Sequence, residues 1–302
     1  MNRTRTTARR TGTATSPIHH GEILQGAFRV HGRIQRGLVT IPCELYWSTA
    51  AFTPEPGGEV TVLPEWRGKA RQAAELTLRE LEPLVGEGLG GTLSVCSDVP
   101  LGRGFGSSTS DVLAAIRAVA DAFDVRLPRE TVARLAVAAE TASDSLMFDQ
   151  SAVLFAHREG ALIEDFGARL PAMHVLGFGT GLAVDTVGFL PARYTERELD
   201  CFDELRVRLR TAVRSGDVAR IGEIATVSTR INQSHLPIPR LEQVCEAAAE
   251  AGAAGVHTAH SGDIAGLLFD LRDPDLSYRL KLAGKLLRDI DYEEQWGFDT
   301  EP

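Results

Sequence analysis

A short glycine-rich segment in the first half of the sequence constrains the fold more than any other feature. It contains three glycines at alternate positions followed by two serines, namely Gly102, Gly104, Gly106, Ser107 and Ser108. An alternating apolar stretch at residues 92–96 precedes it, and an apolar helical run at residues 112–123 follows it. Glycine permits backbone conformations closed to other residues, and the first N–H groups of a helix attract anions because they lack partners within the helix. The segment therefore predicts either a phosphate-binding loop or a glycine turn that ends in serine helix caps.

The spacing of the glycines excludes two common nucleotide-binding motifs. The residues GRGFGS do not match GxGxxG, so a dinucleotide-binding fold is not indicated, and the absence of GK[ST] excludes the usual P-loop. A phosphate site here would use backbone N–H groups at the helix start together with the serine hydroxyls.

Composition narrows the class of protein. With 302 residues, of which 43% are hydrophobic, the chain is long enough for one large or two ordinary domains, and a wholly disordered chain is excluded. No apolar run approaches the roughly 18–20 residues that a membrane span needs, and the net charge of −9 argues against a general nucleic-acid-binding protein. We expect a cytoplasmic protein, because no apolar signal segment is visible near the start and the cysteines are isolated. These cysteines form neither a CxxC pair nor a zinc-ligand pattern: Cys43, Cys96, Cys201 and Cys245.

The first residues are basic although the whole chain is acidic. Arg3, Arg5, Arg9 and Arg10 precede the first acidic residue, Glu22. This Arg- and Thr-rich start has few apolar residues, so we expect a disordered, solvated tail over residues 1–15. An organelle-targeting peptide is a weaker alternative, because no amphipathic apolar face accompanies the arginines.

Hydrophobic periodicity predicts an α+β protein in two parts. Strands are expected at residues 27–34, 38–45, 47–52, 60–63, 92–96, 152–155, 161–163, 174–177, 255–258 and 264–269. Helices are expected at residues 69–84, 112–123, 128–140, 195–215, 218–232, 240–251 and 274–288. Strands dominate the early chain and helices the later chain. We therefore expect an N-terminal domain at residues 16–168 and a C-terminal domain at residues 169–302.

Four segments resemble, in the same order, motifs of the GHMP kinases, the family of galactokinase, homoserine kinase, mevalonate kinase and phosphomevalonate kinase. The segment PLGRGFGSSTSD (residues 100–111) is similar to the family's PxxxGLGSSAA phosphate loop. The other three are SPIHHGEILQG (residues 16–26), AETASDSLMFDQ (139–150) and GVHTAHSGDIAGLLF (255–269). The chain is most similar to the L-threonine kinases of cobalamin assembly, whose corresponding motifs are CGELxQG, SSTAD, EPTDS and AHSG.

The resemblance implies a fold and a reaction. The implied architecture is the two-domain GHMP kinase fold, with an N-terminal domain like domain 2 of ribosomal protein S5 and a ferredoxin-like C-terminal domain. ATP would lie in the cleft between them, with Mg²⁺ as its metal. The other partner would be a small hydroxylated amino acid or metabolite, with no nucleic acid and no membrane, and a homodimer stays open.

The resemblance also implies which residues bind the nucleotide and the metal. The nucleotide would contact the loop and its surroundings, namely Pro100, Gly102, Arg103, Gly104, Phe105, Gly106, Ser107, Ser108 and Thr109. Ser261 and Gly262, in a glycine-containing loop that lies beside the phosphates in the family, would help to close the site. Glu140, together with Ser108 or Ser107, would bind Mg²⁺, which prefers such oxygen ligands. A solvated acid at a helix end is the alternative for Glu140.

Asp144 is the first candidate for the general base of phosphoryl transfer. It matches the catalytic aspartate of the family and the EPTDS motif, although a helix N-cap would look the same in the sequence. Asp149 is the second candidate, because ETASDS is one residue longer than EPTDS between its two acids.

The acceptor site is expected near the first motif. Glu22 and Gln25 offer polar groups for an amino acid, and His20 is a further candidate, although exposed turn residues would give the same pattern. His19 and His20 stand where the threonine kinases have a small residue and a cysteine. Adjacent side chains point apart on a strand or a helix, so these two histidines are not expected to form a metal site.

The expected function is transfer of the ATP γ-phosphoryl group to the hydroxyl of a small amino acid, L-threonine first. One alternative keeps the fold and changes the acceptor to another hydroxylated metabolite of a specialised pathway. A second alternative is a catalytically silent GHMP-fold protein that binds a ligand or partner, which the intact loop and acids disfavour.

Overall fold

The computed structural model describes residues 10–100, 102–181, 193–260 and 263–300. Its strands form one sheet: β1 (Gly12–Val30), β2 (Arg33–Pro56), β3 (Val60–Leu63), β4 (Leu89–Ser97), β5 (Val153–Ala156), β6 (Ala161–Asp165), β7 (Met173–Gly179), β8 (Gly255–Thr258), β9 (Ile264–Asp270) and β10 (Gln295–Asp299). The helices are α1 (Gly68–Val85), α2 (Ser107–Ala122), α3 (Arg129–Glu140), α4 (Glu196–Ser215), α5 (Val218–Asn232), α6 (Leu241–Glu250) and α7 (Leu276–Asp289). The sheet has the order β10-β7-β9-β8-β1-β2-β4-β3, and β5 joins β2 and β6 beside this path.

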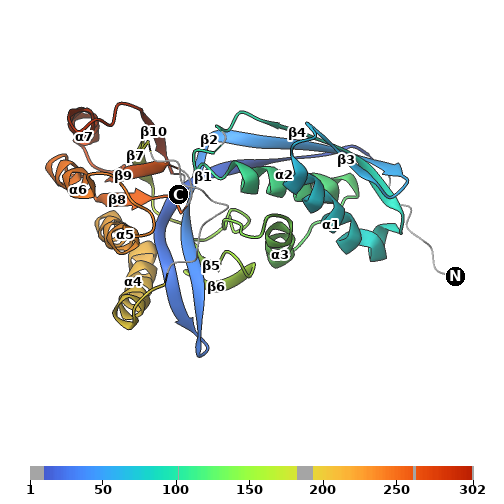
Figure 1. The fold of residues 1–302 in the computed structure, drawn as a ribbon, viewed down its shortest axis with the longest axis horizontal. Helices are drawn as coiled ribbons and strands as arrows, with labels where there is room; N and C mark the ends of the chain where they lie inside the picture. Colours follow the sequence, from blue (N-terminus) through green and yellow to red (C-terminus); the bar gives the residue numbers. More distant parts are fainter. Residues whose placement is uncertain (1–9, 101, 182–192, 261–262, 301–302) are drawn as a thin grey trace.

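A long antiparallel hairpin of β1 and β2 runs through the middle of the molecule (Figure 1). Its turn lies at His31 and Gly32, both with positive φ, which suits a tight two-residue hairpin turn. Three shorter strands were expected here, with turns after residue 34 and near residue 46. Instead β2 continues past residue 34, because residues 35–37 pair with residues 26–28 of β1.

The expected disordered tail over residues 1–15 is wrong for its last part. β1 begins at Gly12, and residues 12–15 pair with residues 49–52 of β2. The guanidinium of Arg10 donates two hydrogen bonds to Asp121 of α2, at 2.9 and 2.6 Å, and the N–H of Thr13 donates to the same carboxylate. Polar threonines and a glycine form this strand end, so hydrophobic periodicity did not reveal it.

The N-terminal part packs α1, α2 and α3 against the sheet. α2 is the central helix, and its apolar side chains are buried nearly all round, in one core cluster with Phe52, Leu93 and Phe155. α1 buries the small and branched residues whose spacing predicted a helix, including Ala73, Leu78 and Leu81. This core holds the N-terminus of α2 rigidly above the hairpin.

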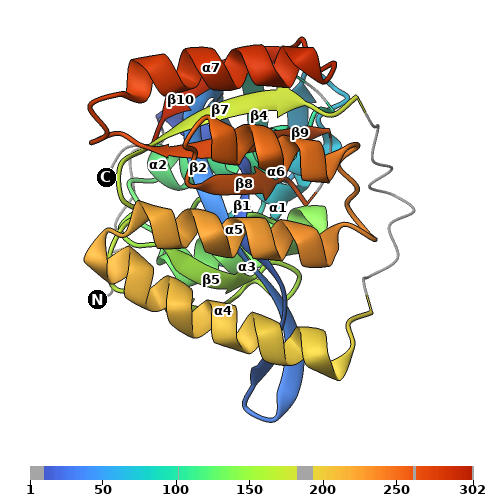
Figure 2. The same ribbon diagram turned by 90° about the vertical axis from the view of Figure 1, so that its left-hand side faces the viewer.

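The C-terminal part is an antiparallel sheet with the order β10-β7-β9-β8. Helices α4, α5 and α6 connect β7 to β8, and α7 connects β9 to β10, which is the ferredoxin-like arrangement (Figure 2). β10 was not expected, because the acidic end of the sequence hides its short apolar pattern. Phe166 and Leu170, on either side of the expected domain boundary, lie in the same core cluster.

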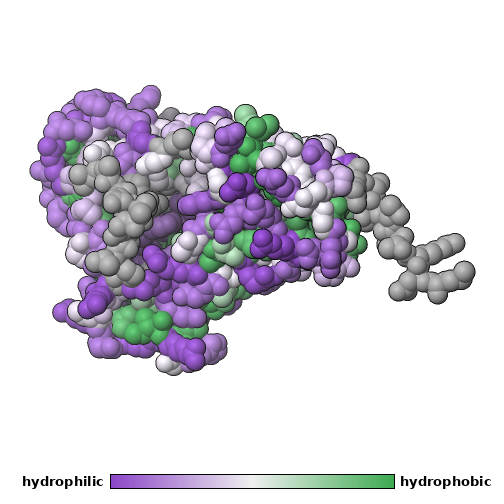
Figure 3. Space-filling view, turned by 45° about the vertical axis from the view of Figure 1, so that its right-hand side comes forward, coloured by the Kyte–Doolittle hydropathy of each residue, from purple (hydrophilic) through white to green (hydrophobic). Residues whose placement is uncertain are grey.

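The sheet continues from one part of the molecule to the other through one strand pair. β1 meets β8 through the pair Glu22 and Thr258, so a single sheet passes from one part to the other. The face in Figure 3 is mostly hydrophilic, with small apolar patches. Within the described ranges, none of the helices combines the length and the apolarity that crossing a bilayer requires.

Candidate active site

The glycine segment forms a tight loop between β4 and α2. Gly102, Gly104 and Gly106 all have positive φ, at 73°, 95° and 67°. Gly106 is the N-cap of α2, and a Cβ there would lie 2.0 Å from Cδ2 of His19. The N–H of His19 donates to the carbonyl of Phe105 at 3.3 Å. The third glycine is therefore required both by its backbone and by the close approach of His19.

Two side chains of this loop are engaged elsewhere. The Arg103 guanidinium donates to Asp263 at 2.8 Å and to Glu294 at 3.0 and 2.8 Å, and the N–H of Asp263 donates to the Arg103 carbonyl. The ring of Phe105 is buried against Tyr46 and Trp296. The resemblance implied that Arg103 and Phe105 contact the nucleotide. Their side chains could contact a phosphate only after leaving the partners named above, whereas their backbone groups could do so without that change.

The remaining loop residues occupy the start of α2 or flank it. Pro100 is half-buried before the loop, and Ser107 and Ser108 are the first two residues of α2. Ser261 and Gly262 lie outside the described residues.

A chain of hydrogen bonds links α2 to the segment after α3. The Ser108 hydroxyl donates to Oε2 of Glu140 at 2.7 Å, and the Thr109 hydroxyl lies 2.8 Å from Oε1 of the same carboxylate. Thr109 also lies 3.2 Å from Oδ2 of Asp144, so it faces the two acids rather than the loop. Burial raises the pKa of Glu140 to about 7, against the effect of these hydroxyls. Glu140 is a buried carboxylate, and the alternative of a solvated helix end is wrong.

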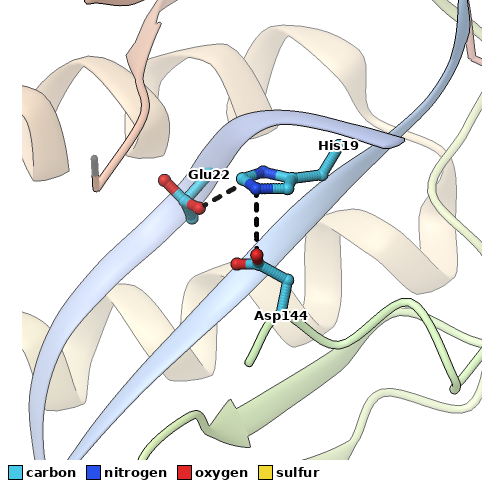
Figure 4. A group of neighbouring side chains, drawn as sticks. All are labelled: His19, Glu22 and Asp144. Carbon is cyan, nitrogen blue, oxygen red and sulfur yellow. Dashed lines mark ion pairs between the residues drawn. The ribbon is translucent and has the colours of Figure 1, made fainter. Parts of the chain in front are cut away.

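Asp144 faces two histidines. Its Oδ2 lies 2.9 Å from Nε2 of His19, and its Oδ1 lies 3.6 Å from Nδ1 of His260 (Figure 4 shows the His19 side). Burial alone would raise the pKa of Asp144, but the charges of His19 and His260 outweigh it and hold that pKa below its usual range. His260 in turn lies 2.8 Å from Oε1 of Glu22. Burial opposes protonation of His260, yet the charges of Glu22 and Asp144 raise its pKa to about 9.

A bulge in β1 brings His19 and Glu22 to the same side. Residues three apart on a regular strand point to opposite faces, but the pairing with β2 shifts register between His19 and Glu22. Gly21, with a φ of 70°, lies in this bulge. Both side chains therefore meet Asp144, which comes from the loop after α3 (Figure 4).

The structure separates two expected acceptor residues from this group. His20 is fully buried, and its Nε2 accepts a hydrogen bond from the indole N–H of Trp296 at 2.9 Å. Burial lowers its pKa well below the usual value, so it is a neutral core histidine. Gln25 donates from its amide to the carbonyl of Thr258 at 3.2 Å and ties β1 to β8. Of the three residues expected to bind the acceptor, Glu22 is the one that lies close to Asp144.

Asp144 and Asp149 have different surroundings. The side chain of Asp149 is 67% exposed and forms an ion pair with Arg129 at 3.4 Å. Asp144 is buried and no helix follows it, so the alternative of a helix N-cap is wrong.

Sequence reasoning did not find the histidines of the site. His19 was noted as a departure from the motif and was not expected to form a metal site with His20, and His260 was covered only by the segment at residues 255–269. His157 also lies near, with its ring 6.0 Å from that of His260, and burial with the His260 charge lowers its pKa to about 3. The sequence did carry a signal, because His260 is the histidine of the AHSG match and His19 lies two residues before the GEILQG match.

Comparison with known families decides the class of this chain. The family model "GHMP kinases N terminal domain" matches residues 69–157, and "GHMP kinases C terminal" matches residues 209–281. This chain is a GHMP kinase. The resemblance inferred from the four segments and the expected α+β two-domain fold are thereby confirmed. GHMP kinases are ATP-dependent phosphotransferases of small molecules and typically use Mg²⁺.

Individual relatives give a narrower comparison. An L-threonine kinase of Citrobacter freundii is 26% identical over 269 residues, which cover 88% of this GHMP kinase and 88% of the relative. An L-threonine kinase of Salmonella typhimurium is 27% identical over 286 residues, covering 90% and 87%. Among solved structures, homoserine kinase from Cytophaga hutchinsonii has a TM-score of 0.67 at 17% identity, covering 96% of this chain and 94% of that one. The last similarity establishes the fold alone.

Proposed function

We propose that this GHMP kinase transfers the γ-phosphoryl group of ATP to the hydroxyl of a small amino acid, L-threonine first. The two L-threonine kinase relatives support the acceptor, since each is matched over nearly the full length of both chains. One structural observation carries the proposal. A buried aspartate held as a carboxylate, Asp144, lies 3.2 Å from the hydroxyl of Thr109, in the first turn of the helix that follows the glycine loop.

In this mechanism Asp144 accepts the proton of the acceptor hydroxyl. Its low pKa makes it a weak base, but phosphoryl transfer passes through a loose transition state in which the attacking hydroxyl needs little activation. The proton then leaves late, when the new P–O bond has made it acidic. His19 and His260 orient the carboxylate and hold it ionised. Glu22, with one carboxylate oxygen unpartnered among the described residues, suits the ammonium group of an amino acid.

The loop backbone and the start of α2 would hold the ATP phosphates. Ser108 and Glu140 would hold Mg²⁺, whose charge neutralises the phosphates during transfer. Their oxygens fit a hard cation, because the partners of the buried Glu140 carboxylate among the described residues are hydroxyls, its pKa is raised, and a cation would keep it ionised.

The metal assignment has its own test. Glu140→Gln and Ser108→Ala should each need a higher Mg²⁺ concentration for half-maximal turnover, and Glu140→Gln should show the larger change. Circular dichroism and melting temperature check that each variant is folded. Near-normal turnover of either folded variant at limiting Mg²⁺ would remove that residue from the metal site.

The acceptor is tested by product analysis. The purified protein, ATP and Mg²⁺ are incubated with L-threonine, L-serine, L-homoserine and non-amino-acid alcohols, and phosphorylated products are identified by mass spectrometry. The proposal predicts O-phospho-L-threonine as the product with the highest kcat/KM. A higher kcat/KM for a compound that lacks an α-amino group would contradict it.

One observation favours a second acceptor class. His19, which contacts the proposed base, stands where the threonine kinases have a small residue, so the acceptor pocket differs at its most critical point. A related hydroxylated metabolite is the second candidate, and the same panel distinguishes the two. ATP turnover with any acceptor would exclude a catalytically silent binding protein.

A further inference from the structure

We propose that His19, Glu22 and Asp144 bind a divalent transition-metal cation such as Zn²⁺ or Co²⁺, at a site separate from that of Mg²⁺. One ligand atom from each residue can be chosen so that all three lie within 4.8 Å of one another. Figure 4 shows the imidazole of His19 facing both carboxylates. The binding does not depend on the proposed function, whereas its effect on catalysis does.

Burial is the first argument for a ligand. His19, Glu22 and Asp144 are only 0%, 2% and 3% exposed. Glu22 Oε2, Asp144 Oδ1 and both ring nitrogens of His19 have no hydrogen bond of acceptable geometry within the described part of the chain. Buried polar atoms without hydrogen bonds are costly. The two histidine nitrogens and Asp144 Oδ1 lie near oppositely charged groups, at 2.9–3.7 Å, whereas Glu22 Oε2 has no such contact within the described residues. The buried Glu22 Oε2 beside these loosely paired atoms favours a further ligand.

The chemistry of the donor atoms defines the class of ligand. One imidazole nitrogen with two carboxylate oxygens suits Zn²⁺, Co²⁺, Mn²⁺ or Fe²⁺, whereas Mg²⁺ prefers oxygen ligands alone. Ligand atoms in a tetrahedral zinc site, with bonds of about 2.0–2.1 Å, are roughly 3.3 Å apart. Metal binding would require these side chains to draw closer together than the 4.8 Å spread of their ligand atoms. The second oxygen of the Glu22 carboxylate, Oε1, is already oriented by His260 at 2.8 Å, as second partners of metal ligands commonly are.

Occupancy of this site would inhibit phosphoryl transfer. The cation would take the Asp144 oxygens that accept the acceptor proton and the Glu22 oxygens that suit the acceptor ammonium. Zn²⁺ should therefore compete with the amino-acid acceptor and not with ATP. Inhibition of this kind would make the enzyme responsive to free transition-metal ions.

Binding is tested on the full chain with saturating Mg²⁺ present. Co²⁺ is titrated, with its visible absorption and the heat of binding recorded, and Zn²⁺ is used to displace it. We expect one Co²⁺ per chain, with the spectrum of nitrogen and oxygen ligation. Loss of one ligand in His19→Gln or Glu22→Gln should weaken the affinity about tenfold or more.

The matched control is His174→Gln. His174 also pairs with a carboxylate, Asp299, at 2.6 Å, but on a different part of the molecule. This variant should bind Co²⁺ as the wild type does. Two substituted ligands are tested because one variant alone could fail to fold, and melting curves identify that case.

Three results would overturn the site. They are the absence of saturable Co²⁺ binding, unchanged binding by folded Glu22→Gln, and a thiolate charge-transfer band showing that cysteine binds the ion. The first of these results, if Co²⁺ binds only when Mg²⁺ is omitted, would show that the two cations share the oxygen site. If no acceptor is phosphorylated, the proposed function fails, while the Co²⁺ spectrum still decides on this site.

Discussion

Asp144 experiences two opposing effects on one carboxylate. Burial favours its neutral form, and two histidines favour its ionised form, which prevails. The same residue is reached by Thr109 from α2, by His19 from the β1 bulge and by His260 from the segment after β8. Its ionised form is the one that can accept a proton in the proposed mechanism.

Substitution of Asp144 tests this role directly. Asp144→Asn should lower kcat by roughly 10²–10⁴-fold, because an amide cannot accept the hydroxyl proton. Affinity for Mg·ATP, measured by calorimetry, should change little. Asp149→Asn is the matched control, since Asp149 forms only an exposed ion pair with Arg129. Equal loss in both variants, or a greater loss in Asp149→Asn, would mean that the base has been misassigned.

The burial of His257 predicts how the free energy of unfolding depends on pH. It is fully buried, and burial lowers its folded-state pKa to about 3 from 6.5. The unfolded chain therefore takes up a proton first as the pH falls, so stability is complete above pH 6.5 and is lost toward pH 3. This group alone should lower the free energy of unfolding by roughly 2 kcal/mol at pH 5, compared with its value above pH 6.5.

Melting curves between pH 8 and pH 4.5 measure this effect. His257→Gln should show a shallower loss of stability on acidification than the wild type, whatever its stability at pH 8. Identical slopes for wild type and His257→Gln would show that His257 is not a neutral buried group.

At the scale of elements, the start of β1 depends on a glycine. A Cβ on Gly12 would lie 2.2 Å from the carbonyl oxygen of Ala118 and from the nitrogen of Ala122, both in the backbone of α2. Gly12→Ala should therefore lower the free energy of unfolding by roughly 1–3 kcal/mol. Gly68→Ala is the control, because a Cβ at Gly68 meets nothing within 4 Å, and alanine is the better helix residue.

Chemical denaturation of both variants gives the comparison. We expect a lower midpoint for Gly12→Ala and an unchanged or higher midpoint for Gly68→Ala. An unaltered midpoint for Gly12→Ala would mean that the first residues of β1 do not pack on α2.

The sequence predicted the helices well and the hairpin poorly. α5 and β8 have the predicted bounds, because regular apolar spacing extends to their ends. The first residues of β1 escaped prediction, because threonine and serine paired at a strand end resemble a solvated tail. At the site, the loop and both acids lay in recognisable motifs. The bulge at Gly21 brings His19 and Glu22 to the same side, next to Asp144. The register shift of a bulge depends on the partner strand, so the sequence of β1 alone could not predict this contact.

At the scale of the whole molecule, Arg103 links the glycine loop to the C-terminal part. Its guanidinium contacts Asp263 and Glu294, and a Cβ on Gly179 would lie 2.8 Å from it. The N–H of Thr180 donates to the Asp263 carbonyl at 2.6 Å within the same junction. The glycine loop of one part is thus held by three separate segments of the other.

Hydrogen exchange can measure this link. Arg103→Gln should speed exchange of the Thr180 and Asp263 amides by about tenfold or more, because removal of the guanidinium lowers the cost of local opening. Amides of β4 should exchange as in the wild type. Exchange that is unchanged at Thr180 would mean that the backbone contacts hold the junction without Arg103.

The joining of the sheet at Glu22 and Thr258 has a structural consequence. Gln25, three residues along β1, reinforces this junction through hydrogen bonds with Ser228, Thr258 and Asn232. Glu22 also carries the carboxylate that meets His19 and His260. A substitution at Glu22 is therefore expected to alter the surroundings of Asp144 and the junction between the two parts together.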